Sequence, residues 1–401
     1  MEQASPTLRK AFHLSGQDSS GITSTFCRLC ANYNVRFLHL SQMLVHGCLS
    51  VNAELEVLAS DDPQLVAEVE AWAKAVAFHL VITKLPTSYD IAPHCGLITT
   101  VLGKERTGAA LPEIIETLKA HQLVMCRMET IGERSMVGVQ LLATKDTISR
   151  EEFHAVRRAL LAKCDALNVD IAVQRDDIYR TSKRLLCMDV DSTFVKGEFI
   201  DELADMCGVK SQVAEITARA MRGELDFEAS LRLRVGLLKG LPMARALELC
   251  ERFELTPGAD DLVRMAKRLG MRVGLVSGGF DFFVERLKKQ FDLDFAFANE
   301  LEVKEGKLTG NVVGTVVDSA RKAQLLKDMA HVFGISLAQT IAAGDGANDI
   351  LMLQTAGLGI AYQAKPRLAE VAGSRFSMND RLDTLFYLMG FDAKKLIGEC
   401  G

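Results

Sequence analysis

The second half of the chain contains short apolar runs that alternate with longer segments of helical periodicity. Five runs have the length and composition of buried strands, at residues 184–190, 271–277, 295–299, 339–345 and 357–362. Alternation of strands with helices builds a parallel sheet that helices cover on both faces. We therefore predict an α/β fold, with a Rossmann-like core over residues 181–401.

Two segments interrupt this alternation and are placed to cover the sheet. Residues 197–256, between the first and second runs, are largely helical and contain no strand candidate. An insertion of this kind is expected to form a helical cap. Residues 299–314 have the pattern of a hairpin that turns at Glu305 and Gly306, which makes them a second candidate flap.

Three of the predicted strands end on polar groups. Each group stands at the carboxyl end of its strand: Asp189 and Asp191, then Ser277, Gly278 and Gly279, then Asp345 and Asp349. Open parallel sheets bind their ligands outside the carboxyl ends of the strands. We therefore expect all of these groups to meet at one edge of the sheet.

The acidic residues of this edge predict a metal site. If helical geometry begins near Asp345, then Asp345 and Asp349 share a face, and with Asp189 and Asp191 up to four carboxylates crowd one crevice. Two anions about 4 Å apart repel by roughly 4 kcal/mol at an effective dielectric of about 20, so such a cluster needs a cation. Because the set is all oxygen, without His or Cys nearby in the sequence, it suits Mg²⁺.

The same edge offers groups for a phosphate. The Ser277 hydroxyl and the amides of Gly278 and Gly279 are expected to open a helix, which is a ready anion site, and Lys322 adds a point charge. Carboxylates, Mg²⁺ and an anion site together indicate phosphoryl transfer. An aspartate can attack phosphorus to form an acyl phosphate, and a second acid can protonate the leaving alkoxide and then deprotonate the attacking water. Asp189 and Asp191 fit these two roles.

The first 180 residues repeat one pattern. Gly16 and Gly103 stand 87 residues apart, and so do Gly21 and Gly108. Each copy contains a strand, a helix, two further strands, a second helix and a last strand, in residues 1–88 and 89–180. We predict two βαββαβ, ferredoxin-like domains ahead of the α/β domain.

The composition argues against two classes of partner, nucleic acids and membranes. The formal net charge of −5 argues against a nucleic-acid partner, which would require a basic patch or stripe. There is no apolar run long enough for a membrane span and no secretory leader pattern at Met1, so we expect a cytoplasmic protein.

The ten cysteines stand singly in apolar segments, as reduced, buried thiols do in the cytoplasm. Cys27 and Cys30 form the one C-x-x-C, which could be half a zinc site or a redox pair. No second C-x-x-C or paired His follows at ligand spacing, so we favour two core cysteines of one helical face.

Residues 184–390 resemble the phosphoserine phosphatases of the haloacid dehalogenase superfamily. The four superfamily motifs occur in order, as "DVDST", "VSGG", Lys322 and "GDGANDILML", and "GELDFEASLRLRV" and the hairpin at 299–314 are close to the phosphatase pattern. The resemblance implies a Mg²⁺-dependent enzyme that hydrolyses O-phospho-L-serine through an aspartyl phosphate, the last step of serine biosynthesis. Phe194 stands where Leu is common in the family.

The resemblance also implies roles for individual residues. Asp189 matches the nucleophile and Asp191 the general acid/base, with Mg²⁺ held by Asp189, the Asp191 carbonyl and Asp345. The remaining matches support the metal or bind substrate: Asp349 and Asn348 for metal and phosphate, Ser277, Gly278 and Lys322 for phosphate, Glu198 for the ammonium, Arg234 for the carboxylate, and Met221 and Phe227 as apolar residues over the ligand.

The two N-terminal copies resemble ACT domains, which bind amino acids at a glycine-bearing first loop. The first copy has Asp18 and Gly21 in this loop, and the second has Gly108 with Glu105 in place of the aspartate. The resemblance implies that serine or another amino acid binds there, and that the chain forms a homodimer through these domains. A purely structural or dimerising ACT pair is the alternative.

Two further functions stay open at this stage. The same chemistry could act on phosphothreonine or another small phosphomonoester. Alternatively, the chain could be an amino-acid-sensing regulator with an inert phosphatase module, although Asp191, Lys322 and Asp345 argue against a module that performs no catalysis.

Overall fold

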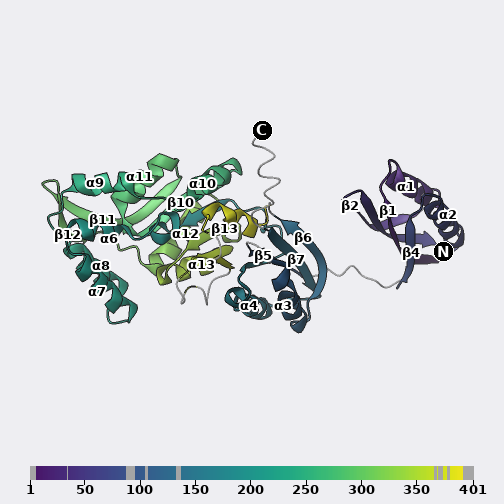
Figure 1. Cartoon of the computed structure of the whole chain (residues 1–401), viewed down its shortest axis with the longest axis horizontal. Helices are drawn as coiled ribbons and strands as arrows, with labels where there is room; N and C mark the ends of the chain where they lie inside the picture. The colour runs from purple at the N-terminus through teal and green to yellow at the C-terminus, as the bar shows by residue number, and fades with distance from the viewer. Residues whose placement is uncertain are drawn as a thin grey trace, which may run out of the picture. The chain divides into compact units, whose positions relative to one another are not determined.

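The computed structural model describes residues 6–33, 35–86, 95–103, 107–131, 137–364, 368, 374–376 and 380–391. The chain divides into two compact units, Met1–Ala92 and Pro93–Gly401. Figure 1 labels many of the helices and strands of both.

The first unit is one βαββαβ domain. Its elements are β1 (Thr7–Gln17), α1 (Ile22–Ala31), β2 (Arg36–Val45), β3 (Cys48–Leu58), α2 (Asp62–Ala75) and β4 (His79–Leu85). The antiparallel sheet has the order β2-β3-β1-β4, and β3 alternates buried and half-buried residues as a strand with one covered face must. The two helices pack on that face, where Phe12, Phe26 and Val69 form part of the core.

The second unit begins with another βαββαβ domain. Its elements are β5 (Cys95–Gly103), α3 (Thr107–Ala120), β6 (Val124–Ile131), β7 (Val137–Lys145), α4 (Arg150–Leu161), the short α5 (Cys164–Leu167) and β8 (Asp170–Arg175). The strand order β8-β5-β7-β6 repeats that of the first unit, so the predicted duplication of topology is confirmed.

The α/β core of the second unit continues the same sheet. Its strands are β9 (Leu185–Met188), β10 (Arg272–Phe280), β11 (Phe295–Lys304), β12 (Lys307–Val313), β13 (Thr340–Gly344), β14 (Leu358–Tyr362) and β15 (Ser374–Phe376). Eleven strands run in the order β12-β11-β10-β9-β13-β14-β15-β8-β5-β7-β6. Neighbours from β11 to β15 pair in parallel, as predicted for a doubly wound core, whereas β15 pairs antiparallel with β8.

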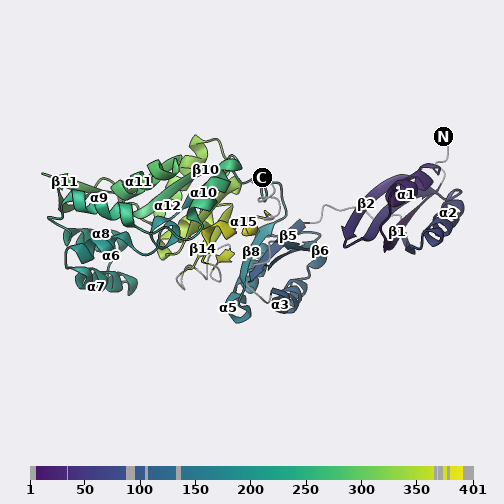
Figure 2. The same ribbon diagram turned by 45° about the horizontal axis from the view of Figure 1, so that its top comes forward.

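Helices cover both faces of this core (Figure 2). They are α10 (Ala259–Arg268), α11 (Asp281–Phe291), α12 (Ser319–Val332), α13 (Ile350–Thr355) and α15 (Leu385–Leu388). The β15–β8 pairing is reinforced by an ion pair from Arg375 Nη1 to Asp165 Oδ2 at 2.7 Å and by a hydrogen bond from Gln174 Nε2 to the Leu388 carbonyl at 2.6 Å.

The cap and the flap form where the sequence predicts them. The insertion contains α6 (Phe199–Met206), α7 (Lys210–Met221), α8 (Phe227–Gly236) and α9 (Met243–Arg252). β11 and β12 form the hairpin, and Glu305 and Gly306 both have positive φ, of 51° and 73°, as a tight two-residue turn requires.

All five predicted strands of the core are confirmed, with one boundary corrected. We expected Gly278 and Gly279 to open a helix, but β10 continues through Phe280 and α11 begins at Asp281. The boundary near residue 180 between the predicted second and third domains stays a prediction, since one sheet runs through both. Within the described residues, no helix has the length and apolar character to cross a membrane.

Candidate active site

The end of β9 delivers two aspartates to the carboxyl edge of the sheet. All four residues of β9 are buried, and the Asp189 amide continues the ladder by donating to the Ala343 carbonyl at 2.9 Å. The chain then turns sharply, because Ser192 takes a left-handed conformation with φ of 57° and the Val195 amide donates to the Val190 carbonyl. This turn fixes Asp189 and Asp191 at the sheet edge, as predicted.

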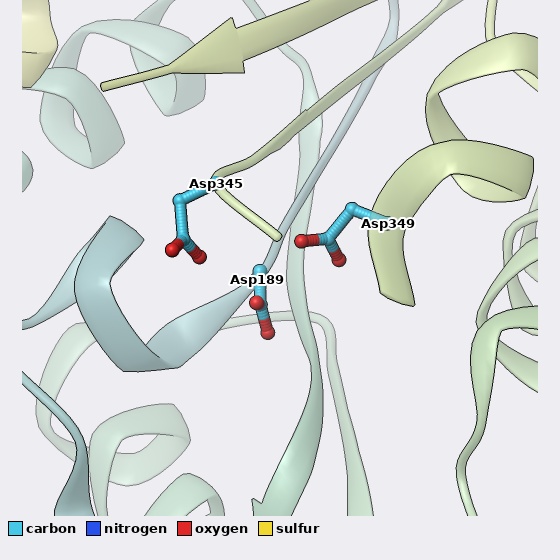
Figure 3. A group of neighbouring side chains, drawn as sticks. All are labelled: Asp189, Asp345 and Asp349. Atoms are coloured by element: carbon cyan, nitrogen blue, oxygen red, sulfur yellow. The ribbon is translucent and has the colours of Figure 1, made fainter. Parts of the chain in front are cut away.

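Three carboxylates gather at this edge. Each of Asp189, Asp345 and Asp349 offers an oxygen, and these oxygens lie within 4.8 Å of one another. Figure 3 shows Asp345 and Asp349 on either side of Asp189, and each of the two comes from a different segment of the chain. All three side chains are buried. Asp349 is held from behind, since its Oδ2 accepts from the Gly346 amide at 3.0 Å and a Cβ on Gly344 would stand 2.4 Å from its Cγ.

Lys322 is the cation of this cluster. It lies on α12, is fully buried, and places its Nζ 2.7 Å from Asp189 Oδ1 and 2.8 Å from Asp349 Oδ1. Burial opposes its charge, but the two carboxylates more than offset this and raise its pKa. Lys322 is therefore a fixed ammonium that bridges two of the three acids.

One ammonium does not balance three carboxylates. The pKa of Asp189 is raised well above its ordinary value by burial and by Asp349, with a further contribution from Asp345, although Lys322 acts in the opposite direction. Asp189 Oδ1 also lacks a well-directed hydrogen bond, since its contact with Lys322 is an ion pair only. A buried, all-oxygen set with an under-satisfied carboxylate fits a hard divalent cation such as Mg²⁺.

Asp191, which we expected as a fourth carboxylate of this cluster, lies outside the group of three and has different partners. Its Oδ1 accepts from the Phe199 amide at 2.7 Å, and its Oδ2 accepts from the Ser277 hydroxyl at 3.2 Å. Burial and the nearby Glu198 carboxylate raise its pKa to about 6. The two acids of one turn therefore differ: Asp189 touches Lys322 and the acidic cluster, while Asp191 is held as a proton donor or acceptor near neutral pH.

The end of β10 is irregular between Val276 and Phe280, where it forms a short glycine loop within the strand, and this loop faces Asp191. The Gly279 amide donates to the Ser277 hydroxyl at 2.8 Å, and a Cβ on Gly279 would stand 2.8 Å from Asp191 Oδ2, so a larger residue would collide with the acid. Asn299 braces this loop from β11: its Nδ2 donates to the Gly278 and Gly279 carbonyls, and its Oδ1 accepts from the Val317 amide. We did not predict this buried asparagine, although its place at the end of the "FAFAN" run was the available signal.

Part of the predicted cap set reaches the same edge. Phe227, at the start of α8, lies against the loop, because a Cβ on Gly278 would stand 3.0 Å from its Cζ and 3.8 Å from Asn348 Nδ2. Glu198 stands at the start of α6, where its Oε1 is 3.4 Å from the Ser192 hydroxyl. Met221, at the end of α7, is 76% exposed.

Arg234 on α8 is half-buried. Burial lowers its pKa, while Glu198, Asp201 and Asp191 act to raise it, so the guanidinium lies in the field of the site acids. Its Nε makes only a long contact, 3.4 Å, with the Ser230 carbonyl one turn earlier. Most of its donors are therefore not engaged by that contact.

The predicted ACT residues lie at helix starts. Gly21, with φ of 94°, precedes α1, and Asp18 is exposed, with its amide donating to the Gly47 carbonyl at 2.7 Å. Gly108 is the second residue of α3 and has open space around it. Glu105 lies outside the described residues.

Cys27 and Cys30 lie on one helix, α1, as favoured from the sequence. Both thiols are free, and burial, with a smaller contribution from Cys27, raises the pKa of Cys30 to about 12. Among the described His, Cys, Asp and Glu residues, the aspartate cluster alone brings three together closely enough for a metal.

Comparison with known proteins agrees with this site. The profile of the haloacid dehalogenase-like hydrolases matches residues 186–354, which span the acidic cluster and Lys322. The chain is 38% identical to a phosphoserine phosphatase of Streptomyces coelicolor, over 95% of this chain and 92% of that protein. It is 37% identical to a phosphoserine phosphatase of Mycobacterium tuberculosis, over 97% and 95% of the two chains.

A solved structure extends the likeness to the fold. The crystal structure of a haloacid dehalogenase family hydrolase from Salmonella enterica serovar Typhi matches with a TM-score of 0.63 and 31% identity, covering 73% of this chain and 98% of that one. With relatives this similar over nearly their whole length, the chain belongs to the phosphoserine phosphatase family of haloacid dehalogenase-like hydrolases.

Proposed function

We propose that this protein hydrolyses O-phospho-L-serine to L-serine and orthophosphate with Mg²⁺, through an aspartyl phosphate on Asp189. The observation that carries the proposal is the buried cluster of three aspartates and Lys322, with Asp191 beside it on the same turn. Phosphoserine is proposed as the substrate because the relatives are named phosphoserine phosphatases.

The chemistry follows from the two environments of the acids. In the first step an Asp189 carboxylate oxygen attacks phosphorus, the bond to the serine oxygen breaks, and Asp191 gives that oxygen a proton. In the second step Asp191 takes a proton from water, the water oxygen attacks phosphorus, and the bond to Asp189 breaks to release orthophosphate. An acid with a pKa of about 6 can serve in both directions near neutral pH.

The metal would be held by Asp189, the Asp191 carbonyl and Asp345, with Asp349 behind them. Bound there, Mg²⁺ would neutralise the negative charge of the phosphoryl group and of the acids. The protein supplies the rest: Lys322 fixes Asp189, and Ser277 and Gly278 border the place of the phosphate with Asn348.

Substrate selection is assigned to the cap. Glu198 would pair with the ammonium of phosphoserine and Arg234 with its carboxylate, while Phe227 covers the phosphate loop and Met221 would fold over the ligand. The Arg234 guanidinium supports this role, because it is half-buried near Glu198 and Asp191 and its hydrogen bond to the Ser230 carbonyl is long.

The N-terminal domains are proposed to be regulatory ACT domains that bind serine or another amino acid and contribute to a homodimer. The repeated strand order supports the ACT assignment, and the apolar side chains Leu40, Met43 and Leu44, exposed on the edge strand β2, support association there. Calorimetric titration of the whole chain with serine should show binding, and absence of heat with every amino acid would favour purely structural domains.

The function is tested by measuring orthophosphate release from L-phosphoserine, phosphothreonine and phosphoethanolamine, with Mg²⁺ or with EDTA. We expect the highest kcat/KM for L-phosphoserine and no turnover in EDTA. Preference for another ester would replace the substrate but keep the mechanism, and release of orthophosphate at an equal rate in EDTA would reject the metal.

A further inference from the structure

A polar cavity lies in the second unit, and none of the three clustered aspartates lines it. It has a volume of about 480 Å³ and is bounded by α4 and β8 of the second βαββαβ domain and by α13 and β14 of the core. This size is within the range of small-ligand sites. Nothing in the proposed catalysis uses it.

The walls of this cavity are strongly cationic. Six basic side chains line it, namely Arg150, Arg157, Arg158, Arg175, Arg180 and Lys183, against the single carboxylate of Asp177. Arg150, His154, Arg157 and Arg158 share one face of α4, and like charges at this spacing destabilise a helix unless something offsets them. Arg175 contacts backbone carbonyls and the Phe153 ring, and Arg157 contacts the same ring, so these two guanidinium groups have no carboxylate partner among the described residues.

Two of the basic residues donate hydrogen bonds to backbone carbonyls, and two others have donors without a partner in the described structure. Arg175 donates to the Ile148 and Ser149 carbonyls, and Lys183 donates to the Ala338 carbonyl at 2.7 Å, so both have structural duties. In contrast, Nε of Arg157 and both Nε and Nη2 of Arg180 are buried without a hydrogen-bond partner in the described structure. An unsatisfied buried donor destabilises the fold, more so when it is charged, so these donors favour an anionic acceptor.

The field inside the cavity acts on its other groups. Burial and the surrounding arginines, first Arg157, lower the pKa of His154. Burial lowers the pKa of Lys183 to about 8, although Asp177 opposes this. The His154 shift reflects the positive field of the arginines as well as burial, whereas the Lys183 shift reflects burial.

We propose that this cavity binds a small anion carrying two or more phosphate groups, through Arg157 and Arg180. Several planar guanidinium groups match phosphate oxygens in pairs, and one phosphate would leave most of the six cations uncompensated. A nucleic-acid strand is a poorer fit, since its backbone needs an open basic stripe rather than a concave site with half-buried donors.

The test is calorimetric titration of the whole chain with pyrophosphate in EDTA, so that no metal complicates the acidic cluster. We expect one site per chain, affinity that falls with salt, and weaker binding of orthophosphate. Arg157→Gln and Arg180→Gln should each weaken pyrophosphate binding about tenfold, the equivalent of losing a charge-assisted hydrogen bond. Arg252→Gln, at an exposed arginine on α9, is the matched control and should bind as the unaltered chain does.

A parallel titration with ADP separates the possible sources of the phosphates. Affinity equal to that of pyrophosphate assigns recognition to the phosphates alone, and tighter binding adds a nucleoside contact. Since Arg157 has no place in the proposed catalysis, Arg157→Gln should keep its phosphoserine turnover, which shows that the variant is folded.

A spectroscopic readout completes the test. The His154 pKa, followed by NMR and assigned with His154→Gln, should rise when pyrophosphate binds, because the anion offsets the arginines. The proposal is overturned if pyrophosphate does not bind, if it binds the two pocket variants as tightly as the control, or if the His154 pKa does not move.

Discussion

Replacing Lys322 by Met should destabilise the second unit strongly, because it removes the one cation that touches two buried acids. Nζ lies 2.7 Å from Asp189 and 2.8 Å from Asp349, and both carboxylates are buried. Removing one partner of a buried ion pair costs about 3–5 kcal/mol. With a slope of roughly 3 kcal/mol per molar urea, the unfolding midpoint should fall by about 1 M or more.

The chain offers an internal control for this measurement. Its single tryptophan, Trp72, lies in α2 of the first unit, so its fluorescence follows the unfolding of that unit, while circular dichroism follows both. We expect the dichroism transition of the second unit to shift and the fluorescence transition to stay. Lys327→Met, at an exposed lysine of the same helix, should leave both in place.

Charge and pH give the variant a further signature. Mg²⁺ should restore part of the lost stability by supplying a cation to the same acids. Burial already raises the pKa of Asp189, and loss of Lys322 raises it further. The folded variant then binds more protons than the unfolded chain above the ordinary carboxyl pKa, so its stability should rise as the pH falls from 8 to 5. If Lys322→Met moves the midpoint no more than Lys327→Met does, the reasoning about the buried cluster is refuted.

Three further substitutions test the site. Asp189→Asn should lower kcat by roughly 10⁴-fold or more while leaving the dichroism spectrum unchanged, and normal turnover would reject Asp189 as the nucleophile. Arg234→Ala should raise the KM for phosphoserine about 10- to 100-fold, because a charge-assisted contact is lost. The KM for phosphoethanolamine, which lacks the carboxylate, should change little. Equal effects on both substrates would show that Arg234 does not recognise the carboxylate. Asn299→Ala should lower the free energy of unfolding by about 2–3 kcal/mol and should also lower kcat. The reason is that the Gly278 and Gly279 carbonyls and the Val317 amide lose their hydrogen-bond partner. A stable variant with full activity would show that the glycine loop does not need Asn299.

The sequence predicted five strands of the core because each is a short apolar run, and three of these runs end on polar groups, whereas the short strand β15 was not predicted. It also predicted that Asp189, Asp345 and Asp349 would meet, since parallel strands bring their carboxyl ends to one edge. These inferences depend on local pattern and on a general rule of sheet topology, and both are visible in a single sequence.

Features that depend on tertiary contacts were not predictable in this way. The extension of β10 through Phe280 depends on Asn299, which hydrogen-bonds the carbonyls of the two glycines from the next strand. The arginines of α4 have the pattern of a solvated helix face, and only the folded chain shows that Arg157 borders a cavity closed by α13. Met221 matched a family position, but a sequence match does not predict that its side chain is exposed at the end of α7.

The pairing of β15 with β8 has a practical consequence for anyone who wishes to produce the catalytic part alone. Truncating the chain near residue 180 would remove β8 and make β15 an edge strand with unpaired amide and carbonyl groups. Such an edge can pair with a strand of another molecule. A fragment that starts before β5 keeps β8 paired with β15. We expect it to stay monodisperse under conditions in which the shorter fragment aggregates.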